Sequence, residues 1–326
     1  MNARPSTCVA RLNERPLSIL AQLAPPAIVS VAMLAFAAPA PALAVSGTLG
    51  PQYGSPLATQ TSQSEVGGFN NPSAQINDNG NSELDAVYAY VSGGTLYVFF
   101  AGNLTFYPVL EGGFPRWLPL DVFIDCAPGG QHQLLSNNPT LDPVVEDLNK
   151  MAGLTFDAGF AADYWLSVGG GLYWPYLTAY FATLPTGGGG SGAYLGQTLP
   201  GPPGVLSGGT NPNGIQMTLD DSNKLGLGNG CGVPTPSAVQ TGIEWAIPLA
   251  TIGNPTGCIR VSAFVASQDH SMISNQVMGP IPPGTCSLTP AAATNFSTIP
   301  GDQFFTICPT TPARGTSWGK LKTLYR

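Results

Sequence analysis

Short runs of apolar residues, each closed by Gly, Asn or Pro, recur along the chain and predict extended strands. Residues 87–91, 95–102 and 118–125 are rich in Val, Tyr, Phe, Leu and Ile. Branched and aromatic side chains suit a pleated, half-buried surface. Three strands joined by turns are therefore expected in this region, and a helix is not.

The pattern continues through the second half of the chain. Residues 161–168 and 172–181 flank Gly169-Gly170-Gly171 and predict a β-hairpin. Residues 138–151 predict a short helix or a 3₁₀ turn. Further strands are expected over residues 214–219, 241–248 and 258–267.

Closely spaced strands with little helical periodicity indicate an all-β fold. We predict a two-sheet jelly-roll β-sandwich with long Gly/Pro-rich loops, in preference to an α/β fold. A β-propeller is the alternative, and the lack of a repeated blade motif disfavours it. Residues 185–214 are rich in Gly and Pro, and we interpret them as a long surface loop within one domain rather than as a linker.

The composition indicates a folded chain with many loops. Charged residues make up only 9%, whereas 41 Gly and 32 Pro supply turns and 43% of the residues are hydrophobic. That much apolar surface is enough for a core and argues against disorder.

The first 44 residues predict a secretory signal peptide. Arg4, Arg11 and Arg15 precede an apolar run, and Ala-Leu-Ala at 42–44 places small residues where signal peptidase needs them. We expect cleavage after Ala44 and a secreted protein, extracellular or held at the cell surface. A membrane anchor is the alternative, but prolines interrupt the run, which is shorter than the roughly 20 apolar residues of a spanning helix.

The rest of the chain divides by composition. Residues 45–78 predict an extended N-terminal arm, residues 79–310 the β-sandwich domain and residues 311–326 a basic C-terminal tail. The tail is interpreted either as a terminus docked on an acidic body or as an attachment or sorting element. Without the leader, 8 basic and 17 acidic residues remain, which disfavours a nucleic-acid partner.

Of the six cysteines, Cys8 leaves with the leader and five remain. Export permits disulfides. The candidates are Cys126 with Cys231, in Gly-flanked turns, and Cys286 with Cys308, around a Pro- and Thr-rich loop. Because five is odd, at least one thiol is free or pairs with another molecule. Zinc is disfavoured, since no Cys-x-x-Cys pair occurs and no His lies near a Cys.

A dense aromatic cluster marks a candidate carbohydrate site. Sugar binding needs flat aromatic faces, and neighbouring strand residues point to opposite faces, so that one of Tyr164 and Trp165 faces out while the other fills the core. The candidate ligand-binding residues are Trp165, Tyr173, Trp174 and Tyr176. Packing in the core is the alternative for each of them.

Acidic residues on predicted strands and turns mark a candidate metal site. Asp121 and Asp125 lie four apart on one strand and share a face, which suits a calcium site or the acid/base pair of a glycoside hydrolase. A simpler interpretation is that Asp125 caps its own turn. The candidate calcium ligands are Glu83, Asp85, Asp125, Asp157 and Asp163.

No nucleophile elbow, zinc-protease motif or phosphate loop occurs, so no catalytic residue is assigned and we expect no enzyme activity.

Several short motifs in order resemble secreted bacterial proteins related to the family-nine carbohydrate-binding modules and the DOMON-like domains. They lie at residues 83–86, 96–104, 122–125, 128–130, 156–164, 242–249 and 274–276. The resemblance covers about residues 80–280. It implies a jelly-roll sandwich that binds sugars or accompanies enzymes, often holds structural calcium and is not itself catalytic. The tryptophan pair that clamps sugars in these modules has no matching motif here.

The expectation is therefore a non-catalytic extracellular β-sandwich that binds a polysaccharide or a cell-surface glycan, with calcium as its cofactor. One alternative is a structural or self-associating surface protein that uses its unpaired thiol. Another is a secreted glycoside hydrolase that uses Asp121 and Asp125.

Overall fold

The structure is a computed structural model of the chain. It describes residues 44–60, 82–104, 109–111, 114–116, 118–141, 148–170, 175–222, 238–285, 287–288 and 290–308, which belong to one compact unit. The leader up to residue 43, residues 61–78 of the predicted arm and the basic tail lie outside these ranges. Among the helices in the described ranges, none combines the length and the apolar character needed to cross a bilayer.

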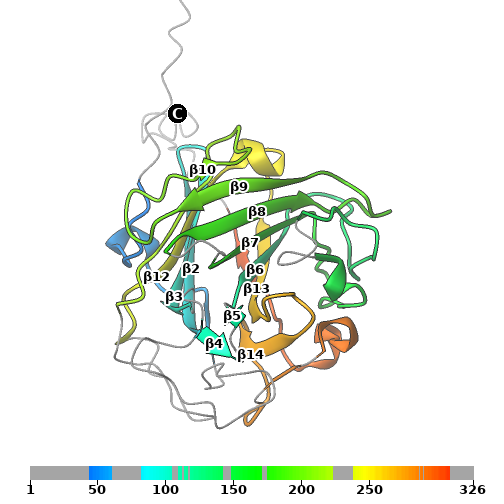
Figure 1. The fold of residues 1–326 in the computed structure, drawn as a ribbon. Helices are drawn as coiled ribbons and strands as arrows, with labels where there is room; N and C mark the ends of the chain where they lie inside the picture. The colour runs from blue at the N-terminus through cyan, green and yellow to red at the C-terminus, as the bar shows by residue number, and fades with distance from the viewer. Residues whose placement is uncertain are drawn as a thin grey trace, which may run out of the picture. The chain divides into compact units, whose positions relative to one another are not determined.

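Two antiparallel sheets make up the fold (Figure 1). The first has the strand order β1-β2-β3-β12-β11, and the second has the order β10-β9-β8-β7-β6-β13-β14, with β15 also paired to β13. The first comprises β1 (Ala58–Thr59), β2 (Glu83–Ser92), β3 (Thr95–Asn103), β11 (Gln216–Leu219) and β12 (Gly242–Pro248). The second comprises β6 (Leu120–Asp125), β7 (Tyr164–Gly170), β8 (Leu177–Thr183), β9 (Gly192–Thr198), β10 (Ser207–Gly208), β13 (Ile259–Ala266), β14 (Ile273–Val277) and β15 (Phe305–Ile307).

Short elements complete the described part of the chain. A separate hairpin pairs β4 (Val109–Glu111) with β5 (Phe114–Arg116). The 3₁₀ helices are η1 (Pro51–Tyr53), η2 (Leu148–Met151), η4 (Leu249–Ile252), η5 (Ala291–Ala293) and η6 (Phe296–Thr298). No described helix reaches seven residues.

The predicted all-β, two-sheet fold is confirmed. The three strands expected in the first half are β2, β3 and β6. The predicted hairpin is formed by β7 and β8, but Gly169 and Gly170, expected in its turn, lie in β7 opposite Thr178 and Leu177. The turn expected within residues 138–151 is η2.

The prediction of one long loop over residues 185–214 is wrong in part. Residues 192–198 form β9, which pairs with β8 and carries β10 on its other edge. Gly196 lies at φ +128°, where a Cβ would collide with the backbone of Ser207. Gly196 therefore permits the close approach of β9 and β10. Composition alone cannot distinguish a glycine with this role from a glycine in a loop.

The main core lies between the two sheets. Val98 and Phe100 of β3 and Trp245 of β12 meet Val122 and Ile124 of β6, and all five are at most 2% exposed. They alternate along their strands with residues that face outward, as a pleated strand requires.

The outward faces of both sheets are also covered. On the second sheet, Phe123 packs on Phe156, which lies in a loop, and Phe264 packs on Phe296, which begins η6. On the first sheet, residues 45–53 cover the aromatic side chains of β2 and β3. Because both faces are buried, β3 and β6 are buried at every position, and the chain needs few charged residues on its strands.

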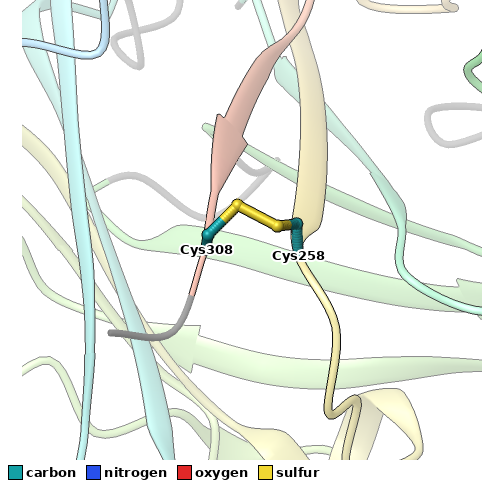
Figure 2. The surroundings of a disulfide bond; sticks show 2 residues. All are labelled: Cys258 and Cys308. Carbon is teal, nitrogen blue, oxygen red and sulfur yellow. A yellow bond between two sulfur atoms is a disulfide. The ribbon is translucent and has the colours of Figure 1, made fainter. Parts of the chain in front are cut away.

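A disulfide joins Cys258 to Cys308 (Figure 2). The pairing of β13 with β15 sets Ile259 opposite Ile307, which brings the cysteines just beyond them together. The predicted bond of Cys308 with Cys286 is therefore wrong, because β15, which carries the pairing, was not recognised in the sequence. Cys286 itself lies outside the described residues.

The second predicted disulfide is also not formed. Cys126 carries a free thiol, and Cys231 lies outside the described residues. Cys126 faces the backbone at the end of η4, with its Sγ 3.5 Å from the carbonyl oxygen of Ile252.

Candidate functional site

The five candidate calcium ligands do not converge on one point. Within the described ranges, no three His, Cys, Asp or Glu side chains gather in a way that would hold a metal ion. Glu83 and Asp85 lie at the start of β2, Asp125 ends β6, and Asp157 and Asp163 precede β7. Asp125, Asp157 and Asp163 are held by hydrogen bonds or an ion pair, whereas Asp85 has no such partner.

Asp163 and Asp125 are engaged at the turn after β6. The Oδ2 atom of Asp163 accepts hydrogen bonds from the N–H groups of Cys126 and Ala127, both at 2.8 Å. Asp125 forms an ion pair with Arg260 at 3.1 Å. Asp163, across the β6–β7 pair, therefore caps this turn. The simpler interpretation expected Asp125 to be the capping residue.

Asp157 is engaged with the segment before β15. Its Oδ2 accepts a hydrogen bond from the N–H of Gln303 at 2.6 Å. Burial raises the pKa of Asp157, although this hydrogen bond opposes the shift. The carboxylate therefore has a structural role in holding this segment.

Glu83 and Asp85 lie at a β-bulge between β2 and β3. Leu84 pairs with Gly102 but Ala86 pairs with Ala101, so that Asp85 is the extra residue of β2. A Cβ on Gly102 would collide with the carbonyl of Glu83, so only glycine permits this approach. Bulges re-aim side chains, and this one places a carboxyl group inside the protein.

The carboxyl group of Asp85 is fully buried and unpartnered. Its residue is 0% exposed, and neither Oδ1 nor Oδ2 has a hydrogen-bond partner. Burial, and then the charge of Glu83, raise its pKa to about 8. A buried carboxylate without donors or a counter-charge is costly, so the site favours either a bound proton or a bound cation.

Amide groups surround this end of β2. Asn103 is directly opposite Glu83 in the strand register. The side chain of Gln60 bridges to β14, where its Nε2 donates to the carbonyls of Asn275 and Val277 at 3.1 and 2.7 Å. Its backbone N–H donates to the carbonyl of Asp85 at 2.7 Å. The carboxyl groups therefore lie where the edges of the two sheets meet.

The group of Asp85, Glu83 and Asn103 fits a calcium ion better than the remaining candidate acids do. Calcium takes carboxylate and amide oxygens, and Asp85 offers two carboxyl oxygens that no protein group uses. Glu83 and Asn103, 2% and 1% exposed, supply further oxygen-bearing side chains at the same end of the strands. Asp125, Asp157 and Asp163 would have to give up existing partners, whereas the carboxyl group of Asp85 has none to give up.

The aromatic candidates do not form one surface in the described residues. Trp165 is 0% exposed, and its Nε1 donates to Oδ1 of Asp121 at 2.8 Å. Its indole therefore packs in the interior and offers no face to a sugar, so its place among the ligand-binding candidates is corrected. Tyr176 is partly exposed, and Tyr173 and Trp174 lie outside the described residues.

A second buried polar group links β6 to the loop before β14. Oδ2 of Asp121 lies 2.8 Å from Nδ1 of His270, and both side chains are 0% exposed. His270 has φ +59°, an unusual backbone conformation for a residue with a side chain. This pair was not predictable from the sequence, because 149 residues separate its members.

Asp121 and Asp125 share the outer face of β6, as the alternation predicted, but they are far apart along it. Four strand residues span roughly 13 Å, whereas the paired acids of glycoside hydrolases lie about 5–9.5 Å apart. Asp121 is also fully buried against Trp165 and His270. The geometry is poor for acid/base chemistry at this pair.

No protein-family model, curated protein or solved structure matches this chain. The class that the fold defines is an antiparallel two-sheet β-sandwich with covered outer faces. Its function has to be inferred from its own side chains.

Proposed function

We propose that this chain is a non-catalytic, extracellular β-sandwich protein that binds carbohydrate and is stabilised by a calcium ion at Glu83 and Asp85. The observation that carries the calcium site is the buried carboxyl group of Asp85, which lacks any hydrogen-bond partner. A divalent cation there would compensate two neighbouring acids that otherwise repel each other.

Calcium at this position would have a structural role. Glu83 and Asp85 belong to β2 and Asn103 to β3, so a shared ion would tie the two strands together at the bulge. Extracellular modules bind calcium with dissociation constants of about 10⁻⁴–10⁻³ M, an affinity that two carboxylates and amide oxygens can supply.

The carbohydrate assignment rests on the family resemblance and on what remains accessible. The described outer faces of both sheets are covered by loops and by residues 45–53, so we place the ligand surface at a loop end of the sandwich. Among the described residues, Tyr176 remains a candidate, since it lies directly before β8 and is partly exposed.

The alternatives receive less support. The separation of Asp121 and Asp125 along β6 disfavours the hydrolase. Burial, followed by the charges of Asp163 and Asp125, raises the pKa of the Cys126 thiol to about 12, which disfavours self-association through a disulfide at this residue.

A glycan array probed with the secreted protein tests the carbohydrate assignment. We expect binding to a subset of glycans, weaker binding after chelation with EDTA, and loss of binding in Tyr176→Ala. Tyr194→Ala, at a partly buried tyrosine on the neighbouring strand β9, is the matched control and should retain binding. An array that stays blank with and without calcium contradicts the carbohydrate assignment and leaves the calcium site to be judged by its own titration.

A further inference from the structure

The buried carboxylate of Glu244 is a binding site for the N-terminal segment. Glu244 lies on the outer face of β12 and is 2% exposed. Its Oε2 accepts hydrogen bonds from the N–H groups of Ser46 at 2.6 Å and Gly47 at 2.9 Å. Its Oε1 accepts one from the hydroxyl of Tyr53 at 2.7 Å.

The expected cleavage point, after Ala44, lies directly before the segment that binds Glu244. Val45 is 0% exposed and packs with the aromatic layer over the first sheet, whereas Ala44 is exposed. Val45 is therefore the first buried residue of the described chain, and it directly follows the bond between Ala44 and Val45. Hydrolysis of that bond consumes one water, leaves a carboxylate on Ala44 and creates an α-ammonium group on Val45.

We propose that Glu244 receives the α-ammonium group of Val45 once the leader has been removed. Backbone bond lengths limit the distance between consecutive nitrogen atoms to about 3.7 Å. Since the Ser46 nitrogen lies 2.6 Å from Oε2, the Val45 nitrogen lies within about 6 Å of the carboxylate in any backbone conformation.

The chemistry of the site favours this partner. Glu244 is held by neutral donors, namely two amides, one phenol and the hydroxyl of Ser46, which satisfy its oxygen atoms but do not neutralise its charge. Burial, and then the charge of Glu244, raise the pKa of Tyr53, as expected next to a buried anion. A cation within about 6 Å stabilises a buried carboxylate strongly, whereas a peptide nitrogen carries no charge.

Leader removal would then lock the N-terminal segment onto the first sheet. Val45 and Tyr53 cover Tyr97 and Phe99 of β3, so firmer docking of the segment protects this aromatic layer. The exported chain would thus gain stability that the chain with its leader lacks. This inference depends on cleavage after Ala44 and not on carbohydrate or calcium binding.

Sequencing the N-terminus of the exported protein is the first test. We expect the mature chain to begin at Val45, and a different first residue overturns the proposal. The second test compares the melting temperature of chains that begin at Val45 with a free or an acetylated amine. The free amine should raise Tm by at least about 3 °C.

Variants assign the effect to Glu244. In Glu244→Gln, which keeps the size and acceptor oxygen of the side chain, acetylation should leave Tm unchanged. The control Asp302→Asn, at an exposed acid, should retain the full difference. Equal Tm for free and acetylated wild-type chains contradicts the proposal, as does an undiminished difference in Glu244→Gln.

If Glu244→Gln does not fold, a chain that begins one residue earlier, at Ala44, tests the position of the amine instead. It carries the same charge but moves the amine to an exposed position. We expect it to melt like the acetylated chain. A melting temperature equal to that of the Val45 chain overturns the proposal.

Discussion

At the scale of single residues, the acids of this chain differ in what their carboxyl groups already bind. Asp157 and Asp163 accept backbone hydrogen bonds, Asp125 pairs with Arg260, and Asp85 has no partner. The sequence places all of these acids on strands or turns but does not reveal their partners. The sequence therefore indicated which acids to consider as calcium ligands, whereas the missing partner of Asp85 became visible only in the fold.

Replacing Asp157 tests the role of one engaged carboxylate. Asp157→Ala leaves the buried N–H of Gln303 without its acceptor, and we expect a loss of about 1–3 kcal/mol in the free energy of unfolding. Asp157→Asn keeps an acceptor oxygen and should lose less. Urea denaturation measures both, and equal stability of Asp157→Ala and the wild type contradicts this role.

The thiol of Cys126 should be inert in the folded protein. Its pKa of about 12, raised above the ordinary value of 9.0 by burial and then by Asp163 and Asp125, lowers the thiolate population at pH 8 by about 1000-fold. Mass spectrometry after iodoacetamide treatment should find Cys126 unmodified in native protein and modified in denaturant. Rapid alkylation of the native protein would show that the thiol is accessible and ionised.

At the scale of elements, strands with apolar runs were predictable and polar strands were not. β2, β3 and β6 follow the apolar runs. β14 contains Ser274, Asn275 and Gln276, which are buried because side-chain hydrogen bonds satisfy them, as when Gln276 accepts from the N–H of Leu84 at 2.8 Å. Such a strand has no hydrophobic pattern that would reveal it, although it pairs with β13, the strand directly before it in the sequence.

The disulfide between Cys258 and Cys308 fastens β15 to β13. The bond closes a separation of 50 residues, so removing it should cost up to about 4 kcal/mol if loop closure dominates. We expect the double variant Cys258→Ser with Cys308→Ser to melt well below the wild type. Cys126→Ser serves as the control for losing a thiol outside the bond, and an unchanged Tm in the double variant contradicts this role.

At the scale of the whole molecule, the low charge of the chain follows from its layers. An antiparallel sheet often leaves one face to water, but here loops and residues 45–53 cover the outer faces. Composition and strand spacing were enough to predict two sheets. The covering layers were not predictable, because they are built by residues such as Phe156, in a loop, and Phe296, in the short helix η6, which show no periodicity.

Calcium binding at Asp85 is the claim on which the proposed function depends most directly. Isothermal titration of calcium into EDTA-treated, dialysed wild-type protein should give a site with a dissociation constant of about 10⁻⁴–10⁻³ M and a higher Tm in calcium. Asp85→Asn should lose both effects, while the exposed-acid control Asp302→Asn keeps them. Absence of binding heat and of a Tm shift in the wild type, or unchanged binding in Asp85→Asn, would contradict the account.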